Sequence, residues 1–264
     1  MADPALNYRL VGSGPPLLLV HGFGVTFNIW RELVPLLADH FSLVMIELPG
    51  IGHSPSPDDG PHEDALYTDA SYTDGSYTEA SITAIESVRQ KLAIPKWSVL
   101  AYSISVGVAA AYSVVHPDRT EKLMLLCPPL LTGWRWRGLR TMLWLDKRWP
   151  VIGDWFFSGG WPLYGLVALV AFNGRPTPLT REWVDEISAQ PYPLLKAILR
   201  EFVPVDRLLE QVGDNALLLC GSKDFVSSRP PAQRVRVAWF SGDHSGPVRV
   251  ARPIAEAVVE FLKR

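Results

Sequence analysis

Ser103 lies between an apolar run and a helix-compatible segment, at a position suited to a reactive serine. Residues 97–101 are typical of a buried strand, and residues 104–115 are rich in small side chains and favour a helix. A sharp strand-to-helix turn lifts a serine hydroxyl clear of the sheet, and the positive end of the helix then faces any oxyanion that develops there. Such a serine can attack the carbonyl carbon of an ester.

Two residues at this turn depart from the usual pattern, which has glycine two places before and two places after the serine. Here Ala101 and Ser105 occupy those places. Their side chains are the next smallest, so the tight turn remains sterically feasible although the motif is weakened. Taken alone, the segment would be a buried strand and a helix with a serine between them. A catalytic role for Ser103 therefore needs support from the rest of the chain.

Apolar runs alternate with helix-compatible segments along most of the chain. Parallel strands that are buried on both faces give continuous Val, Leu and Ile runs of this kind. The alternation therefore predicts an α/β fold with a mostly parallel central sheet flanked by helices. We expect strands at 17–20, 42–46, 97–101, 122–126, 216–220 and 234–240, and helices at 29–38, 81–92, 104–115 and 252–262.

The alternation fails between residues 128 and 213, where Trp, Arg, Pro and Gly are frequent and no clear strand occurs. We interpret this segment as a helical cap, inserted after the sixth strand, that covers the carboxyl edge of the sheet where ligands bind in such folds. Residues 1–127 and 214–264 would then form the α/β core, and residues 128–213 the cap.

Tryptophan and basic residues are concentrated in this segment. Seven of the ten tryptophans lie between Trp134 and Trp183, and basic residues are interleaved with the first of them. The segment could be a lid that binds an apolar substrate or contacts a membrane surface peripherally. We expect most of these tryptophans to be buried and the arginines to be solvated. The candidate substrate-pocket residues are Gly22, Tyr102, Trp155, Phe156 and Trp161.

Residues 67–81 contain three tandem copies of a five-residue unit: YTDAS, YTDGS and YTEAS. The period is too short for a solenoid. Ser76 and Glu79 have the spacing of a capping box for the next helix. We therefore interpret the repeat as a duplicated helix start, with a gating role near the site as the alternative.

Composition excludes several classes of protein. The length suits one core with a small inserted subdomain, and a net charge of -2 gives no reason to expect a nucleic-acid partner. Residues 1–4 lack a secretory pattern, and the longest apolar stretch, 161–172, is too short to span a bilayer. Cys127 and Cys220 suit reduced, buried thiols in a cytoplasmic protein. Scattered histidines and the lack of a phosphate loop predict no metal and no cofactor, and the oligomeric state stays open.

Four stretches resemble the α/β-hydrolase superfamily, in particular its serine carboxylesterases and lipases, over nearly all of the chain except the cap. Each follows an expected strand, and the second departs from the family by starting with Glu47 where Asp is usual. Any one of these stretches is weak evidence for the family on its own. All four together, in this order and at strand ends, are specific evidence for it. They are 21–24 (HGFG), 47–54 (ELPGIGHS), 101–105 (AYSIS) with 116–119 (HPDR), and the late pair 221–224 (GSKD) with 242–244 (GDH).

The resemblance implies a role for particular residues. Ser103 is the expected nucleophile, His244 the base that removes its proton, and Asp224 the acid that orients the imidazole. The order serine, aspartate, histidine along the chain is the one expected for this fold. The backbone amides of Phe23 and Ile104 are the expected donors of an oxyanion hole.

Two competing assignments stay open. Ser105 could be the nucleophile, but Ser103 falls in the turn itself, whereas Ser105 falls in the first helical turn. Asp243 could be the acid, but as a neighbour of His244 it is badly placed to orient that ring. His21 is expected to support the oxyanion loop. The remaining histidines are expected at loops or helix ends: His40, His53, His62 and His116.

These residues predict a serine hydrolase that cleaves small to medium carboxylic esters with an apolar acyl or alcohol part through an acyl-enzyme. The same triad also serves acyl transfer, perhydrolysis and carbon–carbon bond hydrolysis, and the fold also supports non-catalytic binding proteins. The replaced turn glycines favour the binding protein, whereas retention of all three triad residues speaks against it. Epoxide and haloalkane hydrolysis are disfavoured because they need a carboxylate where Ser103 stands.

Overall fold

The computed structural model describes residues 6–56, 76–130, 133–149, 151, 165, 168, 171–172, 174, 177–201, 206–227 and 235–264. Three expected pocket residues, Trp155, Phe156 and Trp161, lie outside the described residues. Most of the repeat at 67–81 lies outside them as well. Its last unit, 77–81, lies in the first turns of a helix that begins at Ser76.

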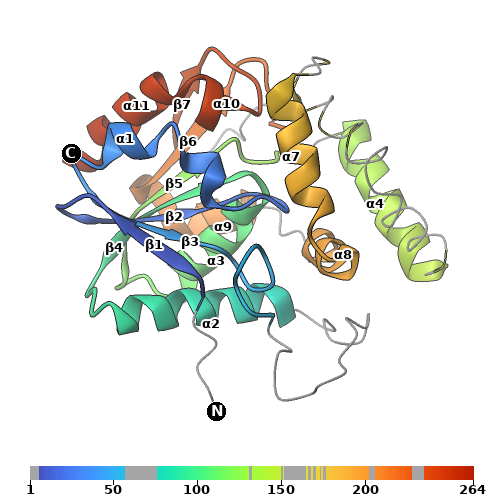
Figure 1. Cartoon of the computed structure of the whole chain (residues 1–264), viewed down its shortest axis with the longest axis horizontal. Helices are drawn as coiled ribbons and strands as arrows, with labels where there is room; N and C mark the ends of the chain where they lie inside the picture. Colours follow the sequence, from blue (N-terminus) through green and yellow to red (C-terminus); the bar gives the residue numbers. More distant parts are fainter. Residues whose placement is uncertain are drawn as a thin grey trace.

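Within the described part of the chain, the sheet has seven strands in the order β1-β3-β2-β4-β5-β6-β7 (Figure 1). β1 pairs with β3 in the antiparallel direction, and every other pair is parallel. The expected mostly parallel α/β sheet is thereby confirmed. The strands are β1 (Tyr8–Val11), β2 (Pro16–Val20), β3 (Ser42–Ile46), β4 (Trp97–Tyr102), β5 (Thr120–Leu126), β6 (Ala216–Gly221) and β7 (Arg236–Phe240).

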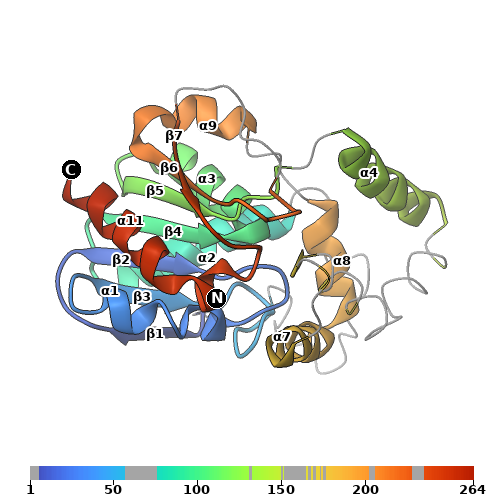
Figure 2. The same ribbon diagram turned by 90° about the horizontal axis from the view of Figure 1, so that it is seen from above.

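Helices cover both faces of the sheet because alternate strand residues point to opposite sides. Leu17 and Leu19 belong to one core cluster, with α1 (Val34–Leu37) and α11 (Ala251–Lys263). Leu18 and Val20 belong to the other, with α2 (Ser76–Lys91), α3 (Val106–Val115) and α9 (Asp206–Val212). Figure 2 shows the two layers from above. Short turns of 3-10 helix occur at η1 (Phe27–Trp30), η2 (Ser103–Ser105) and η3 (Gly213–Asn215), and α10 (Gly246–Arg249) precedes α11.

Some elements differ from expectation. The helix expected at 29–38 is divided into η1 and α1, and Pro35 lies in the first turn of α1. Proline has no amide proton to donate to the carbonyl four residues earlier, so the hydrogen-bond ladder of one continuous helix is interrupted and α1 starts separately. The strand β1 and the helix α10 were not expected. Among the described residues, the segment 128–213 follows the fifth strand rather than the sixth, because residues 6–56 and 76–130 contain the five strands β1 to β5.

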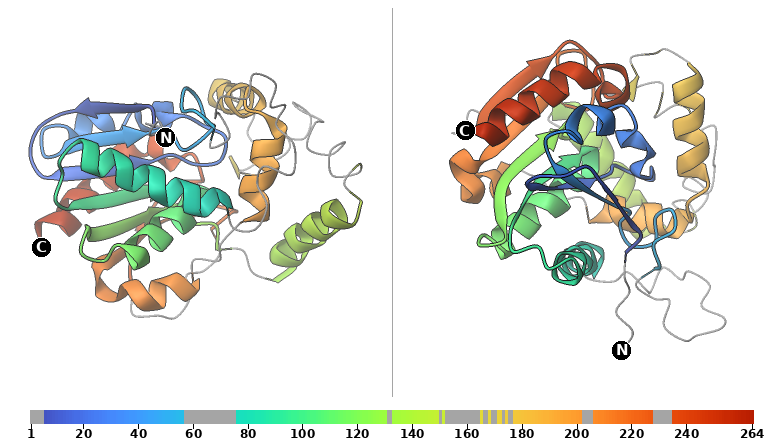
Figure 3. Two further views of the ribbon diagram at one scale, coloured as in Figure 1. Left: turned by 90° about the horizontal axis from the view of Figure 1, so that it is seen from below. Right: turned by 60° about the vertical axis from the view of Figure 1, so that its left-hand side comes forward.

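Four described α-helices lie between β5 and β6. One of them is α9, which belongs to the core layer with α3, and the others are α4 (Gly133–Arg148), α7 (Pro178–Ser188) and α8 (Tyr192–Arg200). In α8, Leu194 and Leu195 pack against the loops that follow β3 and β2, at Gly50 and Gly24 respectively. α7 is joined to the loop region after β2 by the ion pair between Arg31 and Glu182 at 2.7 Å. These two helices therefore lie over the carboxyl ends of the strands (Figure 3).

Among the described residues, the membrane-span criteria of length and apolar character are met by no helix.

Candidate active site

The turn after β4 holds Ser103 in an unusual backbone conformation. Its φ is 57°, in the left-handed region that L-residues other than glycine rarely adopt. β4 ends at Tyr102, and η2 starts at Ser103 itself, so the chain reverses from strand to helix within one residue. Such strain persists only where the surrounding structure imposes it, and it is concentrated at functional sites. The hydroxyl is thus presented at the carboxyl edge of the sheet.

Ser103, Asp224 and His244 come together although they follow three different strands. The Ser103 Oγ lies 2.8 Å from His244 Nε2, and His244 Nδ1 lies 2.9 Å from Asp224 Oδ2. All three residues are buried, with His244 only 2 % exposed. Asp224 follows β6 and His244 follows β7, and the carboxyl ends of parallel strands meet at one edge of the sheet. The three side chains form a continuous relay from carboxylate to imidazole to hydroxyl.

The Asp224 carboxylate is kept charged by its surroundings. Burial works against the charged form, but His244 and the hydrogen bonds from Val226 and Ser227 outweigh it and hold the pKa of Asp224 below its usual value. The Val226 amide donates to Oδ1 at 2.8 Å, and the Ser227 hydroxyl donates to Oδ2 at 3.0 Å. A charged carboxylate only accepts hydrogen bonds, so His244 carries its proton on Nδ1 and leaves Nε2 free to accept from Ser103.

The competing residues have other contacts. Asp243 accepts hydrogen bonds from the amide of Ser245, at 3.0 Å, and from its hydroxyl, and so caps its own loop. Ser105 lies at the last position of η2 and lines a pocket whose lining includes neither Ser103 nor His244. Neither therefore occupies the place that Asp224 or Ser103 holds beside His244.

The loop after β2 is oriented by His21. The His21 ring is fully buried; its Nδ1 lies 2.9 Å from the Gly22 carbonyl oxygen, and its Nε2 accepts from the Leu48 amide at 2.9 Å. Burial lowers the pKa of His21 to about 4, so the ring is neutral, with the proton on Nδ1. Because a trans peptide is planar, fixing the Gly22 carbonyl also fixes the Phe23 amide in the opposite direction. His21 thus supports the loop, as expected.

Close packing brings this loop against the serine turn. A Cβ atom on Gly22 would lie 2.7 Å from the Tyr102 ring and 3.1 Å from the Ser103 Cβ. Glycine is therefore required at this position by space. Tyr102 itself is 1 % exposed, and its hydroxyl donates to the His244 carbonyl oxygen at 2.6 Å. Tyr102 is therefore buried beneath the site, where it precedes Ser103 in the chain and contacts the backbone of His244.

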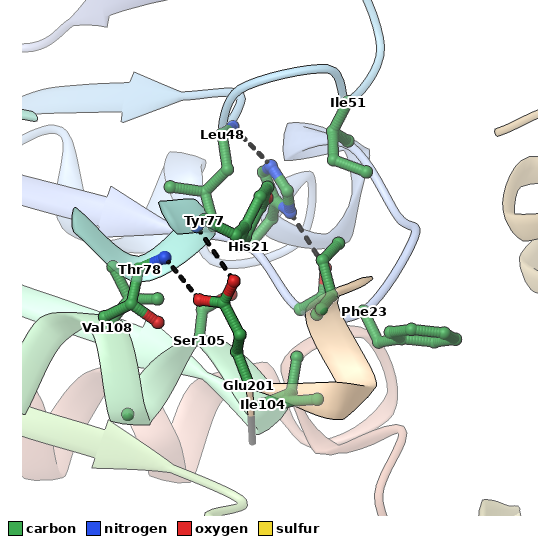
Figure 4. A pocket seen from close by; sticks show the side chains of 13 residues that line it. His21, Phe23, Leu48, Ile51, Tyr77, Thr78, Ile104, Ser105, Val108 and Glu201 are labelled. Atoms are coloured by element: carbon green, nitrogen blue, oxygen red, sulfur yellow. Dashed lines mark hydrogen bonds between the residues drawn. The ribbon is translucent and has the colours of Figure 1, made fainter. Parts of the chain in front are cut away.

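A pocket opens beside the serine turn (Figure 4). Gly22, Phe23 and Ile104 line it, so both residues of the expected oxyanion hole border the same cavity. At its other end, the Glu201 carboxylate accepts from the amides of Tyr77, at 3.0 Å, and Thr78, at 2.9 Å, at the start of α2. The remaining lining residues are His21, Leu48, Ile51, Ser105, Gly107, Val108 and Ile198.

Cys127 is a buried neighbour of the triad that the sequence did not reveal. It follows β5, and its sulfur lies within 4.8 Å of the nearest ligand atoms of Asp224 and His244. Burial raises the pKa of the Cys127 thiol well above its usual value, and the charge and hydrogen bond of Asp224 raise it further. The thiol therefore stays protonated beside the carboxylate. In the sequence, the proximity of Cys127 to the triad was indicated only by its position after β5, the strand between β4 and β6.

The α/β-hydrolase fold model matches residues 15–147, which is half of the chain. Pimeloyl-[acyl-carrier protein] methyl ester esterase from Vibrio vulnificus (strain YJ016) is 28% identical over 143 residues, 52% of this chain and 47% of that protein. The chain thus matches about half the length of such curated relatives.

Two solved structures share the fold over nearly the whole length. A hydrolase from Oleispira antarctica has a TM-score of 0.78 at 18% identity, covering 99% of this chain and 96% of its own. The enol-lactonase from Burkholderia xenovorans LB400 has a TM-score of 0.74 at 18% identity, covering 98% and 96%. With the family model, the sheet order and the strained serine turn in agreement, the chain belongs to the α/β-hydrolase family.

Proposed function

We propose that this protein is a serine hydrolase that cleaves small to medium carboxylic esters with an apolar acyl or alcohol part. The observation that carries the proposal is the relay of 2.8 Å and 2.9 Å contacts that joins Ser103, His244 and Asp224. A serine hydroxyl is a weak nucleophile unless an adjacent base takes its proton, and this relay supplies that base together with the group that orients it.

The proposed reaction proceeds in two halves. The Ser103 Oγ attacks the ester carbonyl carbon while His244 Nε2 takes the hydroxyl proton, and the negative charge on the carbonyl oxygen is bound by the amides of Phe23 and Ile104. His244 then gives its proton to the departing alkoxide, which leaves an acyl group on Ser103. In the second half, water attacks the acyl carbonyl carbon while His244 takes its proton. His244 then returns the proton to the Ser103 oxygen, and the carboxylic acid is released. The Asp224 carboxylate stabilises the imidazolium in both halves.

The apolar preference is supported by the side chains of the pocket that Ile104 borders beside the serine turn; Ser103, Asp224 and His244 themselves do not line this pocket. Its lining includes Phe23, Leu48, Ile51, Val108 and Ile198, which offer an apolar surface next to the serine turn. The ester class is supported by the methyl ester esterase that the chain resembles in sequence. As part of the same proposal, the part of segment 128–213 that precedes α9 is a cap over the site, and α8 within it contributes Ile198, whereas α9 packs in the core with α3.

A cytoplasmic location is also part of the proposal. Cys127 and Cys220 are free thiols buried in the core. Reduced cysteines are typical of compartments in which glutathione and thioredoxin keep thiols reduced.

Hydrolysis of p-nitrophenyl esters of graded acyl length tests the proposal. Ser103→Ala and His244→Ala should each abolish measurable turnover, because the nucleophile or its base is missing. Ser105→Ala is the matched control, since it removes a hydroxyl two residues away that does not contact His244. Covalent labelling of Ser103 by a fluorophosphonate separates an enzyme from a binding protein. Full activity in Ser103→Ala, or a Ser103 that does not label, would overturn the assignment.

A further inference from the structure

The helix α4 carries an exposed face that the proposed chemistry does not use. It stands at the outer end of the molecule, on the same side as α7 and α8 and away from the sheet (Figures 1 and 2). Arg137, Thr141, Trp144 and Arg148 are all exposed and are spaced so that they share one side of a helix. Trp144 is 57 % exposed, which is a large apolar area for a side chain of this size.

The chain continues this exposed surface just beyond α4. Trp149 is 45 % exposed and Val151 is 80 % exposed. The rings of Trp144 and Trp149 meet edge to face with centroids 6.0 Å apart, and the Arg148 guanidinium lies 5.5 Å from the Trp149 ring centre. Aromatic rings and cationic groups are therefore interleaved along α4 and the exposed residues that follow it. We call this set the α4 face: Arg137, Thr141, Trp144, Lys147, Arg148, Trp149 and Val151.

The charge of this helix is opposite to that of the whole protein. Between Gly133 and Arg148 the sequence has five basic residues and a single acid, Asp146, whereas the chain as a whole has a formal charge of -2. Basic residues concentrated on one amphipathic helix attract a negatively charged surface. A basic helix of this kind is complementary in charge to a negatively charged partner.

We propose that the α4 face is a docking surface for membranes that contain anionic lipids. Tryptophan rings lie favourably at the level of the lipid headgroups, where one side of the ring is apolar and the other is wet. Arginine and lysine reach the phosphates at the same depth, and an apolar side chain such as Val151 enters the acyl boundary. Exposed rings next to cations on one outward helix fit a deformable lipid surface better than a purely charged partner.

Docking through this face would turn one particular end of the molecule toward the membrane. α4 lies at the same end as α7 and α8, which cover the carboxyl edge of the sheet (Figure 3). The serine turn lies at that edge, so apolar molecules that partition into the membrane would be close to it. This consequence rests on the proposed function, whereas the docking itself does not.

Vesicle flotation tests the docking without reference to activity. We expect the full-length protein to float with vesicles of equal parts phosphatidylglycerol and phosphatidylcholine, and to stay behind with phosphatidylcholine alone. Each basic residue near such a surface contributes about fivefold in partitioning. Arg137→Glu with Arg148→Glu should therefore lower binding by more than about twentyfold, and Trp144→Ala with Trp149→Ala should remove the blue shift of tryptophan emission on binding.

Matched controls lie elsewhere on the surface. Lys96→Glu with Lys263→Glu makes the same change of charge at exposed residues outside α4, and Trp239→Ala removes a tryptophan that is 55 % exposed on β7. These variants should bind vesicles like the parent. Binding that survives the α4 variants, equal binding to neutral vesicles, or binding to poly-glutamate but not to anionic vesicles would each overturn the proposal. A Ser103→Ala protein should still dock, which separates this result from a failure of the proposed hydrolysis.

Discussion

Ser103 is held differently on its two sides. On the histidine side, Asp224 and His244 are joined to it by side-chain hydrogen bonds between loops that follow three different strands. On the oxyanion side, His21 and Gly22 act through the backbone, one by fixing a peptide plane and the other by leaving room for close approach. The histidine side therefore depends on chemical identity, and the oxyanion side depends on geometry. Variants that change one kind of property at a time can test this difference.

The largest effect is expected on the histidine side, from Asp224→Asn. An asparagine can donate to Nδ1, which would move the ring proton to Nε2 and prevent it from accepting from Ser103. The rate of ester hydrolysis should fall by about 10⁴-fold with little change in folding. Asp243→Asn is the matched control, because Asp243 contacts Ser245 in its own loop. Equal losses in both variants would show that the acid is wrongly assigned.

The next effect is expected on the oxyanion side, from Gly22→Ala. The added Cβ would lie 2.7 Å from the Tyr102 ring, so the loop must move away from the serine turn and take the Phe23 amide with it. Loss of one oxyanion donor costs about 10²–10³ in rate. Fluorophosphonate labelling and steady-state kinetics would measure this loss, and circular dichroism would show whether the fold is kept. Gly138→Ala, which meets no atom within 4 Å, is the control and should be silent.

A pH titration of stability tests how the oxyanion side is supported. Burial lowers the pKa of His21 from 6.5 to about 4. Between these values the unfolded chain takes up a proton that the folded chain does not, so the free energy of unfolding falls as the pH falls from 6.5 to 4. The contribution of His21 is about 3 kcal/mol at most.

Denaturant unfolding of the parent and of His21→Gln across this pH range isolates that contribution. The variant should be less stable at neutral pH but should lose less stability on acidification, because its side chain does not titrate. Parallel pH curves for the two proteins would show that His21 is not the group responsible.

The contact between Tyr102 and His244 links the serine and histidine loops directly, and Tyr102→Phe removes it. The His244 carbonyl would lose its buried donor, which costs about 1–3 kcal/mol of stability. Because that carbonyl belongs to the base, we expect kcat to fall by roughly tenfold with little change in KM. Tyr112→Phe removes a similar hydroxyl from Glu86, away from the site, and should lower stability alone. Equal kcat values in both variants would assign Tyr102 a purely structural role.

The contrast between the two sides also explains what the sequence could predict. Continuous apolar runs predicted the buried parallel strands, and the resemblance to the α/β-hydrolase family implied which residues after those strands form the triad. Ser103, Asp224 and His244 do converge, because each needs only the right side chain after the right strand.

Contacts that depend on packing were not predictable in the same way. The approach of Tyr102 to the His244 carbonyl and of Cys127 to Asp224 depends on how neighbouring loops fold back, and a single sequence has no pattern for that. The helix expected at 29–38 is also interrupted, because Pro35 lacks the amide proton that a continuous helix needs there.

The smallest effects are expected at the two places where the serine turn lacks its usual glycines. Ala101 is fully buried in β4 opposite Val20, so Ala101→Gly adds backbone freedom and costs roughly 0.5–1 kcal/mol of stability. The Ser105 side chain makes no capping hydrogen bond at the start of α3, so glycine there should cost only a few tenths of a kcal/mol.

Neither of these two variants changes the φ that Ser103 already adopts, and neither contacts His244. Ester hydrolysis in both should therefore stay within a few-fold of the parent, with thermal unfolding recording the small loss of stability. If either variant abolished turnover while the fold survived, the methyl of Ala101 or the hydroxyl of Ser105 would be part of what holds the turn in its strained geometry. The serine turn would then depend on side-chain identity as strictly as the histidine side does.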